Sequence, residues 1–126
     1  LLPFIPIVLA KRLPEEILKG LITGLRENNL ITEHGLATES INSPLYESDG
    51  YWRGPIWAPS TMLIVDGLKE AGEELLARDI SHKFINLCRS SGFAENFDAL
   101  SGEGLRDRAY TWTSSVFMIL THEYLQ

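Results

Sequence analysis

The stretch GYWRGPIW, residues 50–57, lies where a long polar segment meets a predicted helix. Proline is favoured in the first turn of a helix, so Pro55 predicts that a helix begins there. Gly72 is a typical helix-ending residue, and Glu73-Glu74 directly after it opens a second helix that ends at Gly92. The two helices therefore form a hairpin with a very short connection.

Three further helices are predicted on either side of this hairpin, at about residues 3–11, 14–28 and 110–125. The middle one begins with a proline and two glutamates, which suits the first turn of a helix and its dipole. Its apolar face repeats with helical spacing and comprises Ile17, Leu18, Leu21, Ile22 and Leu25. The last helix is expected to turn four apolar residues inward: Trp112, Val116, Ile119 and Leu120.

Two long segments without a helical pattern separate these elements, at about residues 30–54 and 93–109. Loops of this length are usually functional when they occur in a compact domain. Short connections join the partners of each hairpin and long loops join one hairpin to the next. The sequence therefore predicts an all-α fold of stacked helical hairpins, with its functional loops on a common rim.

Composition narrows the classes of function. The chain has 126 residues and a formal net charge of −6, so the basic face that a nucleic-acid partner requires is not expected. Its apolar runs are shorter than the roughly 20 residues needed to cross a bilayer, and no membrane association is predicted. The single cysteine, Cys88, excludes an internal disulfide and fits a reducing, cytoplasmic compartment. His34, His82 and His122 lack ligand spacing, so neither a metal nor a cofactor is expected.

The aromatic turn itself predicts a carbohydrate ligand. Tyr51, Trp52 and Trp57 offer flat apolar faces that stack on the C–H side of a pyranose ring. Arg53 supplies paired donors for hydroxyl groups or a carboxylate. The alternative from the residues alone is that the two tryptophans belong to the core and Arg53 pairs with an acid such as Asp49.

Glu95 is the candidate for acid–base chemistry. It lies between Phe93 and Phe97, which would partly desolvate the carboxylate and raise its basicity. Asp98 and Glu103 are other acids of the same segment, and Glu103 is expected to be exposed in a Ser-Gly-Glu-Gly turn. The alternative for Glu95 is a solvated acid near a helix end.

Four motifs in order resemble one known family. They are the YWRGPIW turn at residues 51–57, FAENFD at 93–98, SGEG at 101–104 and YTWT at 110–113. Together they resemble the C-terminal third of the six-hairpin (α/α)6-toroid glycoside hydrolases that include processing α-glucosidase I, mannosylglycerate and glucosylglycerate hydrolases and, more distantly, trehalases. This resemblance covers most of the chain.

The resemblance implies a role for each site residue. Glu95 matches the general base of these inverting enzymes, which activates water for a single displacement. Tyr51, Trp52 and Trp57 match residues that line the pocket for the sugar and its aglycone, and Arg53 matches the motif arginine. Trp112 is expected to support the site from beneath. The implied substrates are α-linked glucosides or mannosides.

The chain also departs from the family, because no segment resembles the hairpin that carries the general acid, an aspartate. It supplies two hairpins and part of a third. We therefore expect residues 1–126 to be the C-terminal portion of a toroid catalytic domain, with little or no hydrolase activity alone. Missing hairpins of the same enzyme, or a second chain, would complete it. The alternative is a non-catalytic helical binding or assembly module that forms homo-oligomers through its open edge.

Overall fold

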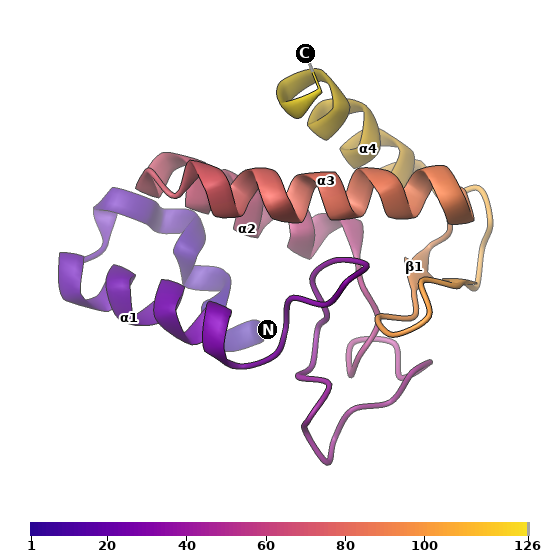
Figure 1. Ribbon diagram of the computed structural model, residues 1–126, viewed down its shortest axis with the longest axis horizontal. Helices are drawn as coiled ribbons and strands as arrows, with labels where there is room; N and C mark the ends of the chain where they lie inside the picture. The colour runs from indigo at the N-terminus through magenta and orange to yellow at the C-terminus, as the bar shows by residue number, and fades with distance from the viewer. Residues whose placement is uncertain (126) are drawn as a thin grey trace.

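The computed structural model describes residues 1–125 and shows a helical protein with one short β-hairpin (Figure 1). The elements, in chain order, are the 3₁₀ helix η1 (Leu2–Arg12), α1 (Glu15–Glu27), α2 (Ala58–Ala71), α3 (Glu74–Ser91), β1 (Asn96–Phe97), β2 (Gly104–Leu105) and α4 (Thr111–Tyr124). The predicted all-α class is confirmed. None of the helices within the described residues is long and apolar enough to cross a membrane.

The α2–α3 hairpin forms the centre of the molecule. Helices η1 and α1 lie at one end of it, and α4 packs across α2 and α3 at the other end (Figure 1). Gly72 makes the connection in a left-handed conformation, with φ of 88°, and its N–H bonds to the carbonyl groups of the last turn of α2. Glycine adopts this conformation without the penalty that a Cβ atom imposes, which is why the sequence signal was accurate here.

The N-terminal segment is helical as expected, but it is a 3₁₀ helix with a kink. Pro3 and Pro6 limit α-helical hydrogen bonding, and Ala10 adopts φ of 46° and ψ of −125°. In α1 the apolar face is narrower than predicted, because Ile22 and Leu25 are buried while Ile17 is exposed. Ile17 lies in the first turn of α1.

Two other expectations about helices were wrong. The third helix begins at Ala58 instead of Pro55, because Ile56 is extended and makes β-bridges to Ala37 and Phe97. In α4, Val116 and Leu120 are buried as predicted, but Trp112 and Ile119 are exposed. Helix α4 contacts the hairpin along one stripe only, so its remaining apolar residues face outward.

The two long loops meet as predicted. The N–H of Ile56 donates to the carbonyl of Phe97 at 2.7 Å, and the reverse bond measures 3.0 Å. Within the second loop, β1 and β2 pair antiparallel, a feature that the sequence did not predict. Phe97 also packs edge-on against Phe84 of α3, with ring centroids 6.2 Å apart. The loops are therefore fixed to each other and to the core.

Close packing of η1 on α2 depends on Gly67. A Cβ atom there would lie 2.4 Å from the carbonyl oxygen of Ile7, so Gly67→Ala must push η1 away from α2. We expect this variant to lose about 1–3 kcal/mol of unfolding free energy in a denaturant titration. Gly20→Ala is the matched control, because Gly20 of α1 faces open space and alanine there should add about 0.5–1 kcal/mol. Equal effects of the two changes would contradict the packing argument.

Candidate functional site

The aromatic turn is a closed loop whose two ends are joined by hydrogen bonds. The N–H of Glu47 donates to the carbonyl of Arg53 at 2.7 Å. The Thr38 hydroxyl accepts a bond from the Gly54 N–H at 3.1 Å and donates to the Pro55 carbonyl at 2.8 Å. Gly54 is required here, because a Cβ atom would lie 2.2 Å from the Glu47 carbonyl oxygen. Residues 47–53 therefore project from a rigid base.

Four aromatic side chains form one cluster, with Trp57 at its centre and Tyr51, Trp52 and Trp112 against it. The Trp52 indole stacks on Trp57, with centroids 4.2 Å apart and planes 11° from parallel. Tyr51 and Trp112 meet Trp57 edge-on, at 4.8 and 5.7 Å. The Trp57 Nε1–H donates to the Tyr51 carbonyl at 2.8 Å, which ties the tip of the turn to the start of α2. The aromatic residues of the motif are thus held in fixed mutual orientations.

The exposed fractions of the side chains distinguish these aromatic residues, for which the sequence predicted similar roles. Tyr51 and Trp52 are each 45% exposed and are available to a ligand. Trp57 is fully buried, because its neighbours cover the indole and it supports them, so its predicted contact with the sugar stays a prediction. Trp112 is 39% exposed while its edge contacts Trp57, an arrangement that allows both support and ligand contact.

Arg53 lies at the base of the turn and pairs with Glu47, at 2.8 Å. The alternative that Arg53 pairs with an acid is therefore observed, with Glu47 in the place of Asp49, which bonds to Arg106. More than half of the Arg53 side chain is exposed, so it remains reachable by a ligand, and its predicted contact with substrate stays a prediction.

Glu95 lies on the segment between α3 and β1 and is half-buried. Its backbone N–H donates to the carbonyl of Asp107 at 2.7 Å, which fixes the residue in the loop. Burial raises the pKa of the Tyr110 phenol, and the nearby charges of Glu95 and Tyr51 raise it further. The Tyr110 ring in turn packs against Trp112, with centroids 5.1 Å apart. Glu95 therefore lies beside the aromatic cluster.

Two other acids of this segment, Asp98 and Glu103, have different environments. The Asp98 carboxylate accepts bonds from the Leu100 N–H at 2.9 Å, the Ser101 hydroxyl at 3.0 Å and the Tyr46 hydroxyl at 3.3 Å. These bonds close the turn between β1 and β2, so Asp98 is a structural residue. Glu103 is exposed, as expected. Glu95, unlike Asp98 and Glu103, is an acid whose charge acts on the Tyr110 phenol.

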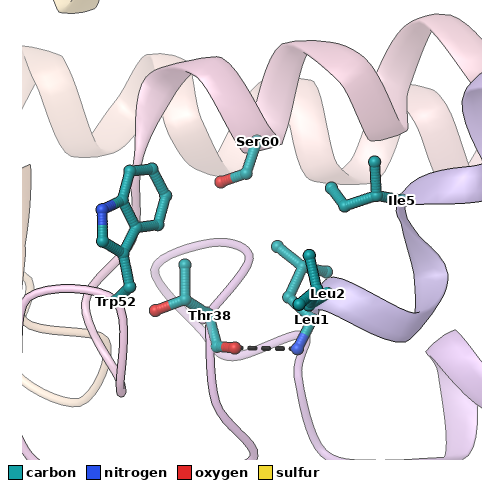
Figure 2. A pocket seen from close by; sticks show the side chains of 6 residues that line it. All are labelled: Leu1, Leu2, Ile5, Thr38, Trp52 and Ser60. Carbon is teal, nitrogen blue, oxygen red and sulfur yellow. Dashed lines mark hydrogen bonds between the residues drawn. The ribbon is translucent and has the colours of Figure 1, made fainter.

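Two hollows adjoin the aromatic cluster. One, of about 240 Å³, is lined by Leu1, Leu2, Ile5, Thr38, Trp52 and Ser60 (Figure 2). Trp52 forms one wall of it, facing the leucine and isoleucine side chains of η1 across the gap (Figure 2). The other hollow, of about 590 Å³, is lined by residues of α4 and of the segment before it, including Tyr110 and Trp112. The cluster therefore presents surface on two sides.

The described residues include no group of three or more histidine, cysteine, aspartate or glutamate side chains that could hold a metal ion. His82 bonds to the Tyr124 carbonyl at 3.2 Å, and burial raises the pKa of the Cys88 thiol to about 12. His82 thus joins α3 to the end of α4, and the Cys88 thiol is not a reactive one.

Sequence reasoning missed two residues of the site. Tyr110 was recognised within a motif but given no role, although it joins Glu95 to the aromatic cluster. Arg106 was not singled out, although its guanidinium lies 5.1 Å from the centre of the Tyr51 ring. The proximity of Tyr110 to Glu95 could have been suspected from their shared loop. A contact between Arg106 and a turn more than 50 residues away gives no local signal.

The chain is similar to known proteins. A family model, the mannosylglycerate hydrolase MGH1-like glycoside hydrolase domain, matches residues 1–113. Mannosylglycerate hydrolase of Thermus thermophilus is 29% identical over 79 residues, covering 63% of this chain and 19% of that protein. A probable mannosyl-oligosaccharide glucosidase of Schizosaccharomyces pombe is 30% identical over 115 residues, covering 78% of this chain and 14% of that protein. The chain thus spans less than one fifth of these curated relatives.

Solved structures show the same fold. The GH63 mannosylglycerate hydrolase of Thermus thermophilus in complex with glucose aligns with a TM-score of 0.80 and 24% identity, over 92% of this chain and 30% of that one. The same enzyme in complex with Tris and D-glycerate aligns with a TM-score of 0.82 and 24% identity, over 94% of this chain and 28% of that one. The predicted arrangement of stacked helical hairpins, as part of an (α/α)6 toroid, is confirmed.

Proposed function

Because this chain belongs to the mannosylglycerate hydrolase MGH1-like glycoside hydrolase family, we propose that it is the base-bearing, C-terminal part of an inverting glycoside hydrolase. The observation that supports this most is the position of Glu95: a half-buried carboxylate whose charge acts on the phenol of Tyr110, a ring that packs against Trp112. A sugar that stacks on Tyr51 or Trp52 would be held by its apolar face while its hydroxyl groups remain hydrogen-bonded.

The proposed reaction is a single displacement. Glu95 accepts a proton from a water molecule, which attacks the anomeric carbon from the face opposite the leaving group. A second carboxylic acid protonates the glycosidic oxygen, about 6.5–9.5 Å from the base to leave room for that water. Asp98 is bonded within its own turn, Glu103 is exposed, and no segment of this chain resembles the hairpin that carries the general acid in the family, so we assign the general acid to a residue outside this chain.

We propose α-linked glucosides or mannosides as substrates, among them mannosylglycerate. This follows the names of the relatives and the glucose and D-glycerate complexes of the Thermus enzyme. The carboxylate of a glyceric-acid aglycone would suit the exposed guanidinium of Arg53 or the hydroxyl groups of Tyr51 and Tyr110.

The stereochemistry of the product tests the proposal. The polypeptide from the complete reading frame that holds these residues is expected to release the β-anomer first from α-linked mannosylglycerate, as followed by ¹H NMR. The isolated 126-residue chain is expected to release no sugar, because it lacks the general acid. First release of the α-anomer would contradict inversion. Turnover by the isolated chain would contradict an external acid.

A second candidate is a non-catalytic assembly module, which the outward-facing apolar residues of α4 favour. Met118 is 69% exposed, and Ile119 and Leu125 are each 41% exposed. Apolar patches of this kind often mark interfaces. The same assay separates the two candidates: a folded complete polypeptide without turnover, together with a homo-oligomeric 126-residue chain in sedimentation, would favour the module.

A further inference from the structure

Two residues with left-handed backbone conformations face each other across the two functional loops. Tyr51 in the aromatic turn has φ of 62°, and Arg106, just after β2, has φ of 61°. Such conformations are disfavoured for residues with a Cβ atom and persist only where the surroundings hold them. Their occurrence at two facing residues next to Glu95 calls for a structural cause.

The Arg106 side chain supplies that cause through several contacts at once. Its guanidinium donates to the Asp49 carboxylate, to the Asp49 carbonyl at 3.4 Å and to the Asn96 Oδ1 at 3.4 Å. The same group lies over the Tyr51 ring, 5.1 Å from its centre, within the range of a cation–π interaction. One planar group thus joins the tip of the aromatic turn to the strand that directly follows Glu95.

The Tyr51 ring is held from two directions. The Arg106 guanidinium covers it on one side, and the buried Trp57 contacts it edge-on at 4.8 Å. Trp57 is fixed at the start of α2 and cannot follow movements of the turn, whereas Arg106 belongs to the loop of Glu95. Trp57 therefore ties Tyr51 to α2, and Arg106 ties it to the loop of Glu95.

We infer that Arg106 is a positioning residue, which holds Tyr51 and the turn around it at a fixed place relative to Glu95. This inference rests on the proposed function, because it concerns the same site. Arg106 acts through Tyr51 and Asp49 and is not assigned a contact with substrate. Losing it should weaken binding in the ground state and the transition state alike, which raises KM and leaves kcat unchanged.

The test uses steady-state kinetics with mannosylglycerate on the complete polypeptide. Arg106→Met should raise KM by about five- to tenfold with kcat within about twofold of the wild type. Arg106→Lys keeps the charge but loses the planar guanidinium, so its KM should lie between those of the wild type and Arg106→Met. The lysine variant also provides the test if the methionine variant does not fold. Arg26→Met is the matched control: Arg26 pairs with Glu73 at 2.7 Å on a distant surface, and KM should not change.

A double-mutant cycle separates positioning from direct contact. If Arg106 acts through the tyrosine ring, Arg106→Met combined with Tyr51→Leu should bind no worse than Tyr51→Leu alone. Multiplied effects in the double variant would overturn the inference. An unchanged KM in both Arg106 variants, or a loss of melting temperature without a change in KM, would also overturn it.

Failure of this inference differs from failure of the proposed function. If Glu95→Gln is inactive while the Arg106 variants keep a wild-type KM, the positioning role alone is wrong. If Glu95→Gln retains turnover, the assignment of the base is wrong whatever the Arg106 variants show.

Discussion

Replacing Glu95 with glutamine is expected to lower the turnover of mannosylglycerate by about 10²–10⁴-fold, the range that general-base catalysis contributes. The amide matches the carboxylate in shape but cannot accept the proton of the attacking water. Because the backbone of Glu95 is held by the carbonyl of Asp107, the change should not move the loop. The dissociation constants of glucose and of D-glycerate, measured by tryptophan fluorescence, should stay within a few-fold of the wild-type values.

Glu103→Gln is the matched control for this experiment. Glu103 lies in the same loop, carries the same functional group and is exposed, so its turnover should be unchanged. Wild-type turnover in Glu95→Gln would remove Glu95 as the base. Equal losses in both glutamine variants would indicate a general effect of charge instead.

The second large effect is expected for stability, at Trp57. Its side chain is fully buried, stacks on Trp52 and supports the edges of Tyr51 and Trp112. Trp57→Ala removes the centre of this cluster and should cost about 3–5 kcal/mol of unfolding free energy, as for large aromatic residues in other cores. Because domains are stable by only about 5–15 kcal/mol, this variant should be close to unfolded at ambient temperature.

Denaturant titration of three variants would test this. Trp57→Phe keeps a ring but loses the bond to the Tyr51 carbonyl, so we expect a smaller loss, of which about 1 kcal/mol belongs to that bond. Leu75→Ala should change stability by less than about 0.5 kcal/mol, because Leu75 is 85% exposed. A loss of unfolding free energy below about 1 kcal/mol for Trp57→Ala would show that the aromatic cluster does not stabilise the fold.

The helices could be predicted well because their signals are local. Helix α1 begins after Pro14 with two glutamates, and α2 and α3 are separated where Gly72 takes a left-handed conformation. Capping and chain reversal depend on neighbouring residues, which a single sequence displays directly. The start of α2 was misplaced by three residues for the opposite reason: Ile56 is extended because its backbone bonds to Phe97, about 40 residues later.

The site could be predicted only in part. The four motifs identified residues that gather around it, and the structure brings Trp52 and the segment of Glu95 to the same aromatic cluster. Which aromatic side chain is exposed and which is buried could not be read from the motif, since Trp52 and Trp57 differ only in what covers them. Arg106 was missed because its partners, Asp49 and Tyr51, lie far away in the sequence.

The sequence alone determined the helical hairpins, the two long loops and the family, because helix ends, turns and motifs are encoded by residues close together in the chain. The tertiary structure decided how those loops meet. It determines that Trp57 is buried, that Tyr51 and Trp52 remain exposed, and that Arg106 joins the turn to the loop of Glu95. These outcomes depend on burial and on contacts between distant segments, which exist only once the chain is folded.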